Sequence, residues 1–168
     1  SGNMGRGHEF DALLEAAANF VDEPRVRFLF IGSGARKQDI QNQARRLNLS
    51  NVIFQPFQPR ELLGVSLTVP DVHIVSLRHE MSGLIVPSKF YGALAAGRSL
   101  LFLGPASSEI AQVIQEYDCG FVCSDINADE ITRIVREFIT HAELAQKQGR
   151  NARRAIEERC CRWRPYNA

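Results

Sequence analysis

The sequence predicts an α/β fold in which helices cover both faces of a mostly parallel sheet. Three observations lead to this prediction. Strand-like and helix-like patterns alternate along the 168 residues, and short turns connect them. The strand pattern at residues 26–31 is almost wholly apolar, as strands buried on both faces are. Such alternation joins parallel strands through right-handed crossovers, which gives a three-layer, doubly wound sheet.

Composition sets the limits of this prediction. The chain is 45% apolar, enough for one domain with a full core, which excludes a disordered tail or a disulfide-stapled miniprotein. Twenty basic residues oppose nineteen acidic ones, so the net charge of +1 gives no electrostatic reason to expect nucleic acid as a partner. No apolar run approaches the roughly 20 residues that a membrane-spanning helix needs.

The first half of the chain begins with a glycine-rich loop, residues 1–7. Such a loop normally follows a buried strand, so we expect a longer protein whose first strand precedes this sequence. Apolar residues from Phe10 to Val21 then fall at helical spacing, and Pro24 closes the helix. The elements expected next are a strand at 26–31, a turn at 32–34, a helix at 36–47, a strand at 52–54, a proline-rich turn at 56–59, a short helix carrying Leu62 and Leu63, and a strand at 72–75.

The second half begins with an irregular segment, residues 77–86. Pro87 and Ser88 open a helix that Gly97 ends, because proline suits the first helical turn and glycine the position after the last. A strand at 100–103 follows, and Ser107 or Ser108 caps the next helix. The remaining expected elements are an edge strand at 120–122, a turn and cap at 125–129, a helix carrying residues 131–139, and a last helix at 142–158 followed by a tail at 159–168.

The strongest local signal for chemistry is the predicted helix start at residues 86–89. Ligands of open parallel sheets bind beyond the carboxyl ends of the strands, where such helices begin. A helix N-terminus offers unpaired N–H groups and a positive dipole end, the Ser88 hydroxyl adds a donor, and Lys89 adds a full charge. Only three lysines occur, Lys37, Lys89 and Lys147. The residues alone also allow an ordinary helix start with a surface lysine.

Weaker candidates surround this segment. In the opening loop, Gly2 and Gly5 let a backbone approach an anion, and Arg6 could clamp it, although a plain strand-to-helix turn is the alternative. Glu80 lies in the irregular segment, where a site role fits a charged residue. We expect His73 to be a core or packing histidine and His141 to be exposed. Cys119 and Cys123 should be half-buried thiols, and Cys160 and Cys161 a frayed pair in a reducing compartment.

Several stretches occur together in a set order: Ser1-Gly2-Asn3-Met4-Gly5-Arg6, Phe28 to Gly34, Asn51 to Phe54 with Leu62-Leu63, and Val86 to Arg98. This order resembles the C-terminal half of retaining, GT-B-fold glycosyltransferases of family 4 (group 1), in the branch that builds bacterial lipopolysaccharide and exopolysaccharide. The resemblance covers about residues 1–158, and the P-S-K-x-x-x-x-L-A-A-G-R stretch is its most specific part.

The resemblance implies a Rossmann-like domain that holds a nucleoside-diphosphate sugar, most often a UDP-sugar. Ser88 and Lys89 would meet the diphosphate, and Gly2, Gly5 and Arg6 would lie over the same phosphates. Phe57 and Gln58 would border the base, and Glu109, in the loop after Gly104-Pro105, would lie near the sugar or ribose. A separate N-terminal domain would hold the saccharide or lipid-linked acceptor, and the isolated domain would be inactive.

This sequence departs from the family pattern at two places. Many members carry two glutamates seven residues apart, and those positions here are Leu84 and Gly92, so Glu80 or Glu109 would have to substitute. The arginine–lysine pair usual near the first loop is incomplete, with Arg6 present and His8 nearby. The implied mechanism uses a helix dipole with Arg6 and Lys89 to stabilise the leaving diphosphate, and no metal or other cofactor.

Three other interpretations remain at this point. The chain could be a nucleotide- or phosphate-binding regulatory domain without transferase activity, a dehydrogenase-type cofactor domain, or an α/β interaction module without a ligand. The dehydrogenase is disfavoured because no G-x-G-x-x-G follows a strand. If the resemblance holds, we expect a cytoplasmic protein that associates peripherally with the inner membrane face in its full-length form.

Overall fold

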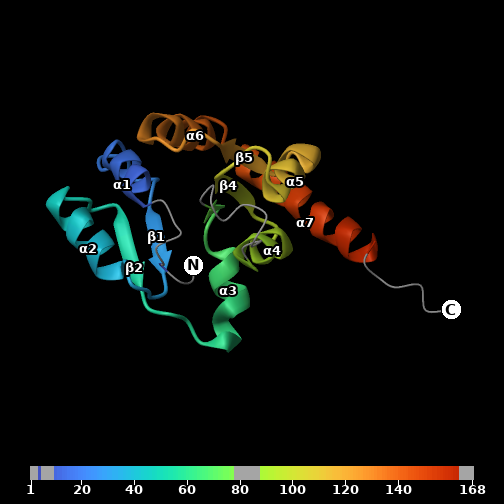
Figure 1. Cartoon of the computed structure of the whole chain (residues 1–168), viewed down its shortest axis with the longest axis horizontal. Helices are drawn as coiled ribbons and strands as arrows, with labels where there is room; N and C mark the ends of the chain where they lie inside the picture. The colour runs from blue at the N-terminus through green and yellow to red at the C-terminus, as the bar shows by residue number, and fades with distance from the viewer. Residues whose placement is uncertain (1–3, 5–9, 78–87, 163–168) are drawn as a thin grey trace.

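The computed structural model describes residue 4 and residues 10–77 and 88–162, with the backbone alone at 88 and 160–162. The candidates Gly2, Gly5, Arg6 and Glu80 lie outside the described residues, as do most of the irregular segment and the end of the tail. Along the chain the elements are α1 (Asp11–Ala18), β1 (Phe28–Ile31), α2 (Lys37–Arg46), β2 (Val52–Gln55), η1 (Arg60–Leu62), α3 (Leu63–Thr68), β3 (Val72–Ser76), α4 (Ser88–Ala95), β4 (Ser99–Leu103), α5 (Glu109–Tyr117), β5 (Gly120–Cys123), α6 (Ala128–Thr140) and α7 (Leu144–Arg162) (Figure 1).

In the part of the chain that the structure describes, all paired strands are parallel, which confirms the predicted α/β class, but they form two sheets instead of one. β1 pairs with β2, and β3, β4 and β5 form a second sheet in that order. β5 is an edge strand, as expected. Parallel strands need long crossovers, and helices between successive strands supply them here. The carboxyl ends of the strands in each sheet therefore lie at one edge, where ligand sites of this fold class form.

Residues of β4 alternate between two hydrophobic cores and so define three layers. Leu101 and Leu103 join a core built with α1, α2, α6 and β1. Leu100 and Phe102 face the opposite way, into a core built with α4, α5 and α7. Every residue of β4 is buried, because helices cover both of its faces. Fully burying one side chain of this size contributes about 1.5–3 kcal/mol, so these two cores hold the layers together.

Glycine and capping residues start and end several helices where the sequence predicts. Gly97 has a φ of 63°, and the amides of Gly97 and Arg98 donate to carbonyls of the last turn of α4. Of the two serines proposed as a cap, Ser108 is the one that accepts from the amide of Ala111. Asn127 caps α6 in the same way. The last helix was expected to end at residue 158, but α7 continues to Arg162.

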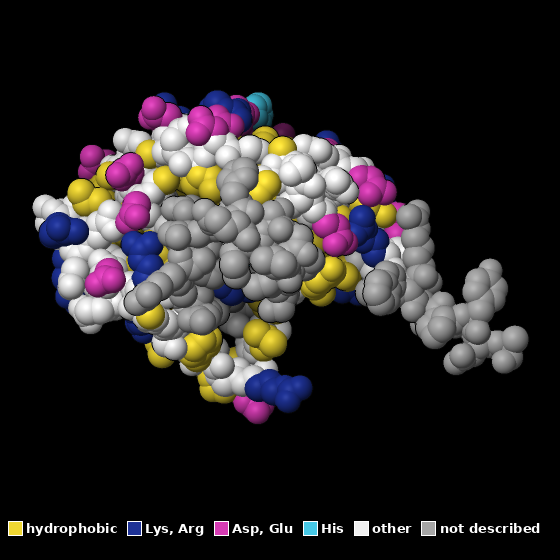
Figure 2. Space-filling view, in the orientation of Figure 1, with side chains coloured by type: hydrophobic (Ala, Val, Ile, Leu, Met, Phe, Trp, Pro, Cys, Tyr) yellow, Lys and Arg dark blue, Asp and Glu magenta, His cyan; other side chains and the backbone are white. Residues whose placement is uncertain are grey.

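The short segment η1–α3 is the exception to this packing. Neither helix contains a buried residue, and Leu62, Leu63, Val65 and Val69 are 46–60% exposed. Figure 2 shows apolar side chains gathered at the lower part of the molecule, where α3 lies in Figure 1. The side chain of Leu67 lies close to Gly92 of α4, and the Leu67 carbonyl bonds to His73, so the segment contacts α4 and β3. Across the described ranges, no helix is long and apolar enough to cross a membrane.

The structure corrects the expectation for the two cysteines of the second sheet and confirms the expectations for the two histidines. Cys119 and Cys123 are fully buried, not half-buried, because each lies at an end of β5 beneath a helix layer. Burial raises the pKa of Cys119 to about 12, so the thiol stays protonated. The half-buried ring of His73 packs against α3 and bonds to the Leu67 carbonyl at 2.8 Å, and His141 is exposed.

Candidate functional site

The start of α4 brings a half-buried cation to the carboxyl edge of the second sheet. α4 begins at Ser88, in the crossover from β3 to β4, and Lys89 lies in its first turn. Phe90 is 1% exposed and fixes the helix in the core between β4 and α7. Lys89 is half-buried, and burial lowers the pKa of its ammonium group from the ordinary 10.5. A desolvated cation at the N-terminus of a helix attracts an anion strongly.

Met4, the residue of the opening loop that the structure describes, meets the turn that follows β1. The Met4 side chain is buried, its N–H donates to the Ser33 carbonyl at 2.7 Å, and its carbonyl accepts from Arg36 N–H at 3.1 Å. Sequence reasoning treated the opening loop and the turn at 32–34 as separate candidates. The structure brings them together at Met4, at the carboxyl end of β1.

Lys37 is a cation at this turn that sequence reasoning did not select. Its Nζ donates to the Gly32 carbonyl at 3.1 Å, and the side chain is half-buried. Gly32 and Gly34 have φ angles of 132° and 146°, which only glycine adopts easily. The conformation of this turn therefore requires glycine at both positions. Two features of the sequence could have identified Lys37 as a candidate. It is one of only three lysines, and it follows a G-x-G turn.

The two residues expected to border a base lie in the turn between β2 and η1. The Phe57 ring is 56% exposed, so one face is available for stacking. The side-chain amide of Gln58 donates to the Pro56 carbonyl at 3.1 Å and steadies the turn. This turn follows the carboxyl end of β2, the same edge of the first sheet at which the Gly32 turn lies.

Glu109 was expected in a loop, but it is the first residue of α5. Its carboxylate accepts from Arg159 Nη1 at 3.1 Å, and Arg159 also lies 3.7 Å from Glu116. The Glu109 side chain is 54% exposed, so the carboxylate remains accessible to a ligand. Because water screens the two charges, the ion pair between Glu109 and Arg159 is weak. Glu109 thus follows β4 at the expected edge, tied to α7 by an ion pair that sequence reasoning did not foresee.

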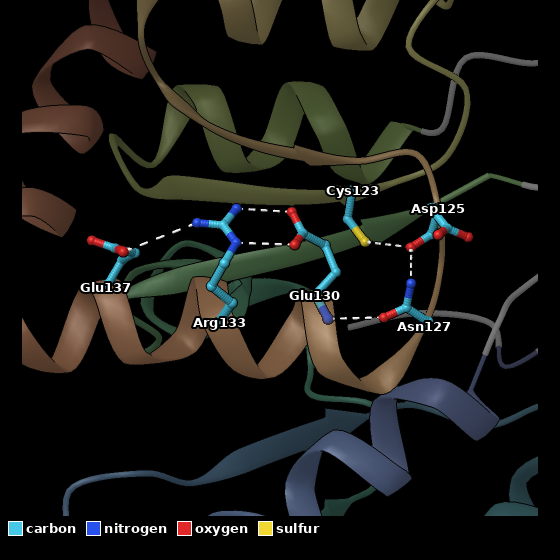
Figure 3. A network of polar contacts seen from close by, with 6 residues as sticks. All are labelled: Cys123, Asp125, Asn127, Glu130, Arg133 and Glu137. Carbon is cyan, nitrogen blue, oxygen red and sulfur yellow. Dashed lines mark hydrogen bonds and ion pairs between the residues drawn. The ribbon is translucent and has the colours of Figure 1, made fainter.

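A separate polar network lies at the carboxyl end of β5 (Figure 3). The Cys123 thiol and the Asn127 amide both donate to the Asp125 carbonyl, and Glu130 N–H donates to Asn127. Arg133 forms two hydrogen bonds to Glu130, at 2.8 and 2.9 Å, which lowers the pKa of that carboxyl. An open depression of about 440 Å³ here is lined by Ser124, Asp125, Asn127, Asp129, Glu130 and Arg133. Because its one cation, Arg133, is paired with Glu130, the network holds the start of α6 and does not compete with α4 as an anion site.

Comparison with known proteins now identifies the family. The sequence profile of the family described as "Glycosyl transferases group 1" matches residues 1–155, so the chain belongs to this family. WcaI of Escherichia coli (strain K12), named for glycosyl transfer in colanic acid biosynthesis, is 29% identical over 123 residues, which are 73% of this chain and 30% of WcaI. WbjE of Pseudomonas aeruginosa, named as a glycosyltransferase, is 29% identical over 137 residues, which are 82% of this chain and 34% of WbjE. The chain thus spans about a third of the length of these relatives.

Solved structures share the fold at lower identity. The C-terminal domain of the group 1 glycosyl transferase LpcC from Francisella tularensis superposes with a TM-score of 0.73 at 16% identity, covering 95% of this chain and 84% of that one. HepE of Anabaena, solved in complex with UDP-glucose, gives a TM-score of 0.76 at 16% identity over 94% of this chain and 43% of its own. These matches confirm a GT-B-type, Rossmann-like domain.

Proposed function

We propose that this chain is the donor-binding part of a glycosyltransferase of bacterial polysaccharide biosynthesis. Membership of the group 1 family supports the class of reaction, and the family membership disfavours a purely regulatory role. The observation that carries the assignment of the site is the half-buried Lys89 in the first turn of α4, at the carboxyl edge of the parallel sheet. The donor in this proposal is a nucleoside-diphosphate sugar with UDP as its nucleotide.

The chemistry follows from where charge develops. When the bond from the anomeric carbon to the diphosphate breaks, negative charge builds on the leaving oxygen. The amides of α4 with Lys89 stabilise that charge, and Arg6, Gly2, Gly5 and Ser88 complete the proposed phosphate site. Phe57 and Gln58 border the base, and Glu109 or Glu80 contacts ribose or sugar. We propose that transfer needs no bound metal, because these cationic and N–H groups supply the positive charge.

The remaining parts of the reaction belong to the full-length protein. The relatives are about three times as long as the matched region, and the proposal assigns the saccharide or lipid-linked acceptor to an N-terminal domain in the remainder. We expect a hexosyl or N-acetylhexosaminyl group to move. We also expect the 168-residue chain alone to turn over no donor, and the full-length protein to work in the cytoplasm, peripherally at the inner membrane face.

A ligand titration tests the donor site directly. The melting temperature of the chain is followed with UDP, GDP, ADP and NAD at equal concentrations. A ligand present at 100 times its Kd stabilises the folded state by about 2.7 kcal/mol, which is several degrees for a domain of this size. We expect UDP or GDP to raise the melting temperature and NAD to leave it unchanged. A rise with NAD alone contradicts the proposal, and no rise with any nucleotide favours an interaction module.

A transfer assay separates binding from turnover. Purified chain is incubated with a UDP-sugar and a saccharide acceptor, and released UDP is measured. We expect no release above the uncatalysed rate from the 168-residue chain, and release from the full-length protein. Detectable acceptor-dependent release from the short chain would contradict the assignment of acceptor chemistry to the remainder.

A further inference from the structure

Arg36 contacts the chain on both sides of residues 5–9. On one side, its backbone N–H donates to the Met4 carbonyl at 3.1 Å. On the other side, its guanidinium carbon lies 5.8 Å from the centre of the Phe10 ring, and its Nη2 donates to Asp11 Oδ1 at 3.4 Å. Phe10 directly precedes α1, Asp11 is the first residue of α1, and Arg36 directly precedes α2. One residue between β1 and α2 therefore joins Met4 to the start of α1.

The side chain of Arg36 is held in a largely buried position. It is 22% exposed, whereas the Asp11 side chain is 53% exposed. The Phe10 ring beneath the guanidinium is buried and packs against Phe30 of β1, with 6.2 Å between the ring centroids. A cation over an aromatic face gains more where water is largely excluded, and an ion pair with an exposed carboxylate gains less. The contact with Phe10 is therefore the stronger of the two.

The turn before Arg36 is fixed as well. The Ser33 carbonyl accepts from Met4 N–H at 2.7 Å, and the Gly32 carbonyl accepts from Lys37 Nζ at 3.1 Å. The Met4 side chain is buried in the core. Met4 is thus attached through main-chain bonds, which a substitution at position 36 retains, whereas the contacts of Arg36 with the start of α1 need its side chain.

We propose that Arg36 is a positioning residue for the donor diphosphate, because its side chain sets where the start of α1 lies relative to Met4. Residues 5–9 connect these two points, and they include Gly5 and Arg6. The inference rests on the proposed donor function, in which Gly5 and Arg6 contact the phosphates. The guanidinium of Arg36 is directed at Phe10 and Asp11, so Arg36 acts through the two ends of this segment.

The expected consequence is a change in affinity that depends on the phosphates. Fixing the two ends of a segment reduces the conformational freedom that the segment must lose when a ligand binds. If the ends are held together for only a fraction of the time, the apparent Kd rises by the inverse of that fraction. Phe57 and Gln58, which border the base in the proposal, lie in a different turn, between β2 and η1. Loss of the Arg36 side chain should therefore weaken binding of a nucleoside diphosphate more than binding of the nucleoside.

NMR titration of the 168-residue chain with UDP and with uridine tests the proposal. We expect Arg36→Ala to raise the Kd of UDP by about fivefold or more and the Kd of uridine by less than about twofold. Arg36→Lys keeps a positive charge near Asp11 but lacks the planar group over Phe10, so its Kd for UDP should lie between the two. Arg45→Ala is the matched control, because Arg45 is an exposed arginine of α2 that bonds to Asn42, and it should leave both Kd values unchanged.

Other results would overturn the proposal. An unchanged Kd of UDP in Arg36→Ala would remove Arg36 from the donor site, and equal losses for UDP and uridine would give it the purely structural role of tying α1 to α2. If Arg36→Ala does not fold, Arg36→Lys provides the comparison, and an unchanged Kd of UDP in that variant counts against the proposal.

The titration also separates this inference from the proposed function. UDP binding that Lys89→Ala weakens and Arg36→Ala does not would leave the donor site in place and overturn the role of Arg36 alone. Absence of UDP binding by the unsubstituted chain would contradict the proposed donor site, and the role of Arg36 would fall with it.

Discussion

The Ser99 hydroxyl donates to Gln148 Oε1 at 2.6 Å, and both side chains are buried. Ser99 begins β4, and Gln148 lies on α7, so the bond joins the central strand of the second sheet to the last helix. Two polar groups at this depth are tolerated because each satisfies the other. The bond therefore fixes the position of α7 against the layer that also carries α4.

Removal of one partner should cost more than removal of both. Ser99→Ala leaves the buried Gln148 carbonyl oxygen unsatisfied, and we expect a loss of about 1–3 kcal/mol in the free energy of unfolding. The double variant Ser99→Ala/Gln148→Leu should lose less than the sum of the single variants, because no polar group remains unpaired. Urea denaturation of the four proteins measures this coupling. Additive losses would show that the bond contributes nothing beyond the two separate side chains.

Gly149 of α7 approaches the backbone of Gly97 so closely that a Cβ at Gly149 would overlap the Gly97 carbonyl. Gly149→Ala must push α7 away from the turn that ends α4, and we expect a loss of about 1–3 kcal/mol from the forced shift. Gly64→Ala is the matched control, because a Cβ there meets nothing within 4 Å and alanine favours a helix. Thermal unfolding should separate the two variants, and equal melting temperatures would contradict the close approach.

His73 should make the fold sensitive to mild acid. Burial lowers the pKa of His73 below 6.5, and the charge of Arg98 adds to this effect, so the folded ring stays neutral where the unfolded ring takes up a proton. The stability that depends on the neutral ring is complete above about pH 6.5 and falls as the pH drops toward the lowered pKa. His73→Gln should flatten the pH dependence of the unfolding free energy below about pH 6.5, and the exposed control His141→Gln should keep it. An unchanged slope in His73→Gln would rule out His73 as its source.

The helices and strands were predictable because the interactions that start and end them involve residues close together in the sequence. The four apolar residues at 100–103 indicated a strand, and they form β4 together with Ser99. Gly97 ends α4 because the position requires a positive φ, and Ser108 caps α5 through an amide three residues ahead. The start of α4 at Ser88 was predictable for the same reason, since Pro87 and Ser88 are typical of a first turn.

Contacts between distant residues were not predictable, because a polar side chain looks the same in a sequence whether it is buried or exposed. Ser99 and Gln148 are 49 residues apart, and Glu109 and Arg159 are 50 apart. The separation into two sheets also has no local signature, since each strand pattern fits one continuous sheet equally well. Lys37 differs, because its bond to Gly32 spans only five residues.

Glu109 offers a test of where the sugar lies. If its accessible carboxylate contacts the sugar, Glu109→Gln should weaken binding of a UDP-sugar by about tenfold and leave UDP binding unchanged. Arg159→Gln is the control, because it removes the ion pair with Glu109 but keeps the carboxylate. Calorimetric titration of both variants with both ligands provides the comparison. Loss of affinity for UDP and the UDP-sugar alike would move Glu109 from the sugar to the nucleotide, and no loss would remove it from the site.

Lys89 carries the proposed diphosphate contact, so its charge should control nucleotide affinity. Lys89→Ala should weaken UDP binding by about tenfold or more while changing the melting temperature little, because the ammonium group meets the ligand whereas the buried Phe90 holds the helix in the core. Lys147→Ala is the matched control, since Lys147 is exposed on α7 and pairs with Asp118 at 2.9 Å. Burial lowers the pKa of Lys89 from 10.5, so UDP affinity should begin to fall at a lower alkaline pH than an ordinary lysine would give. That fall should vanish in Lys89→Ala and persist in Lys147→Ala, and equal affinities in all three proteins would return Lys89 to the role of a helix-start residue without a ligand.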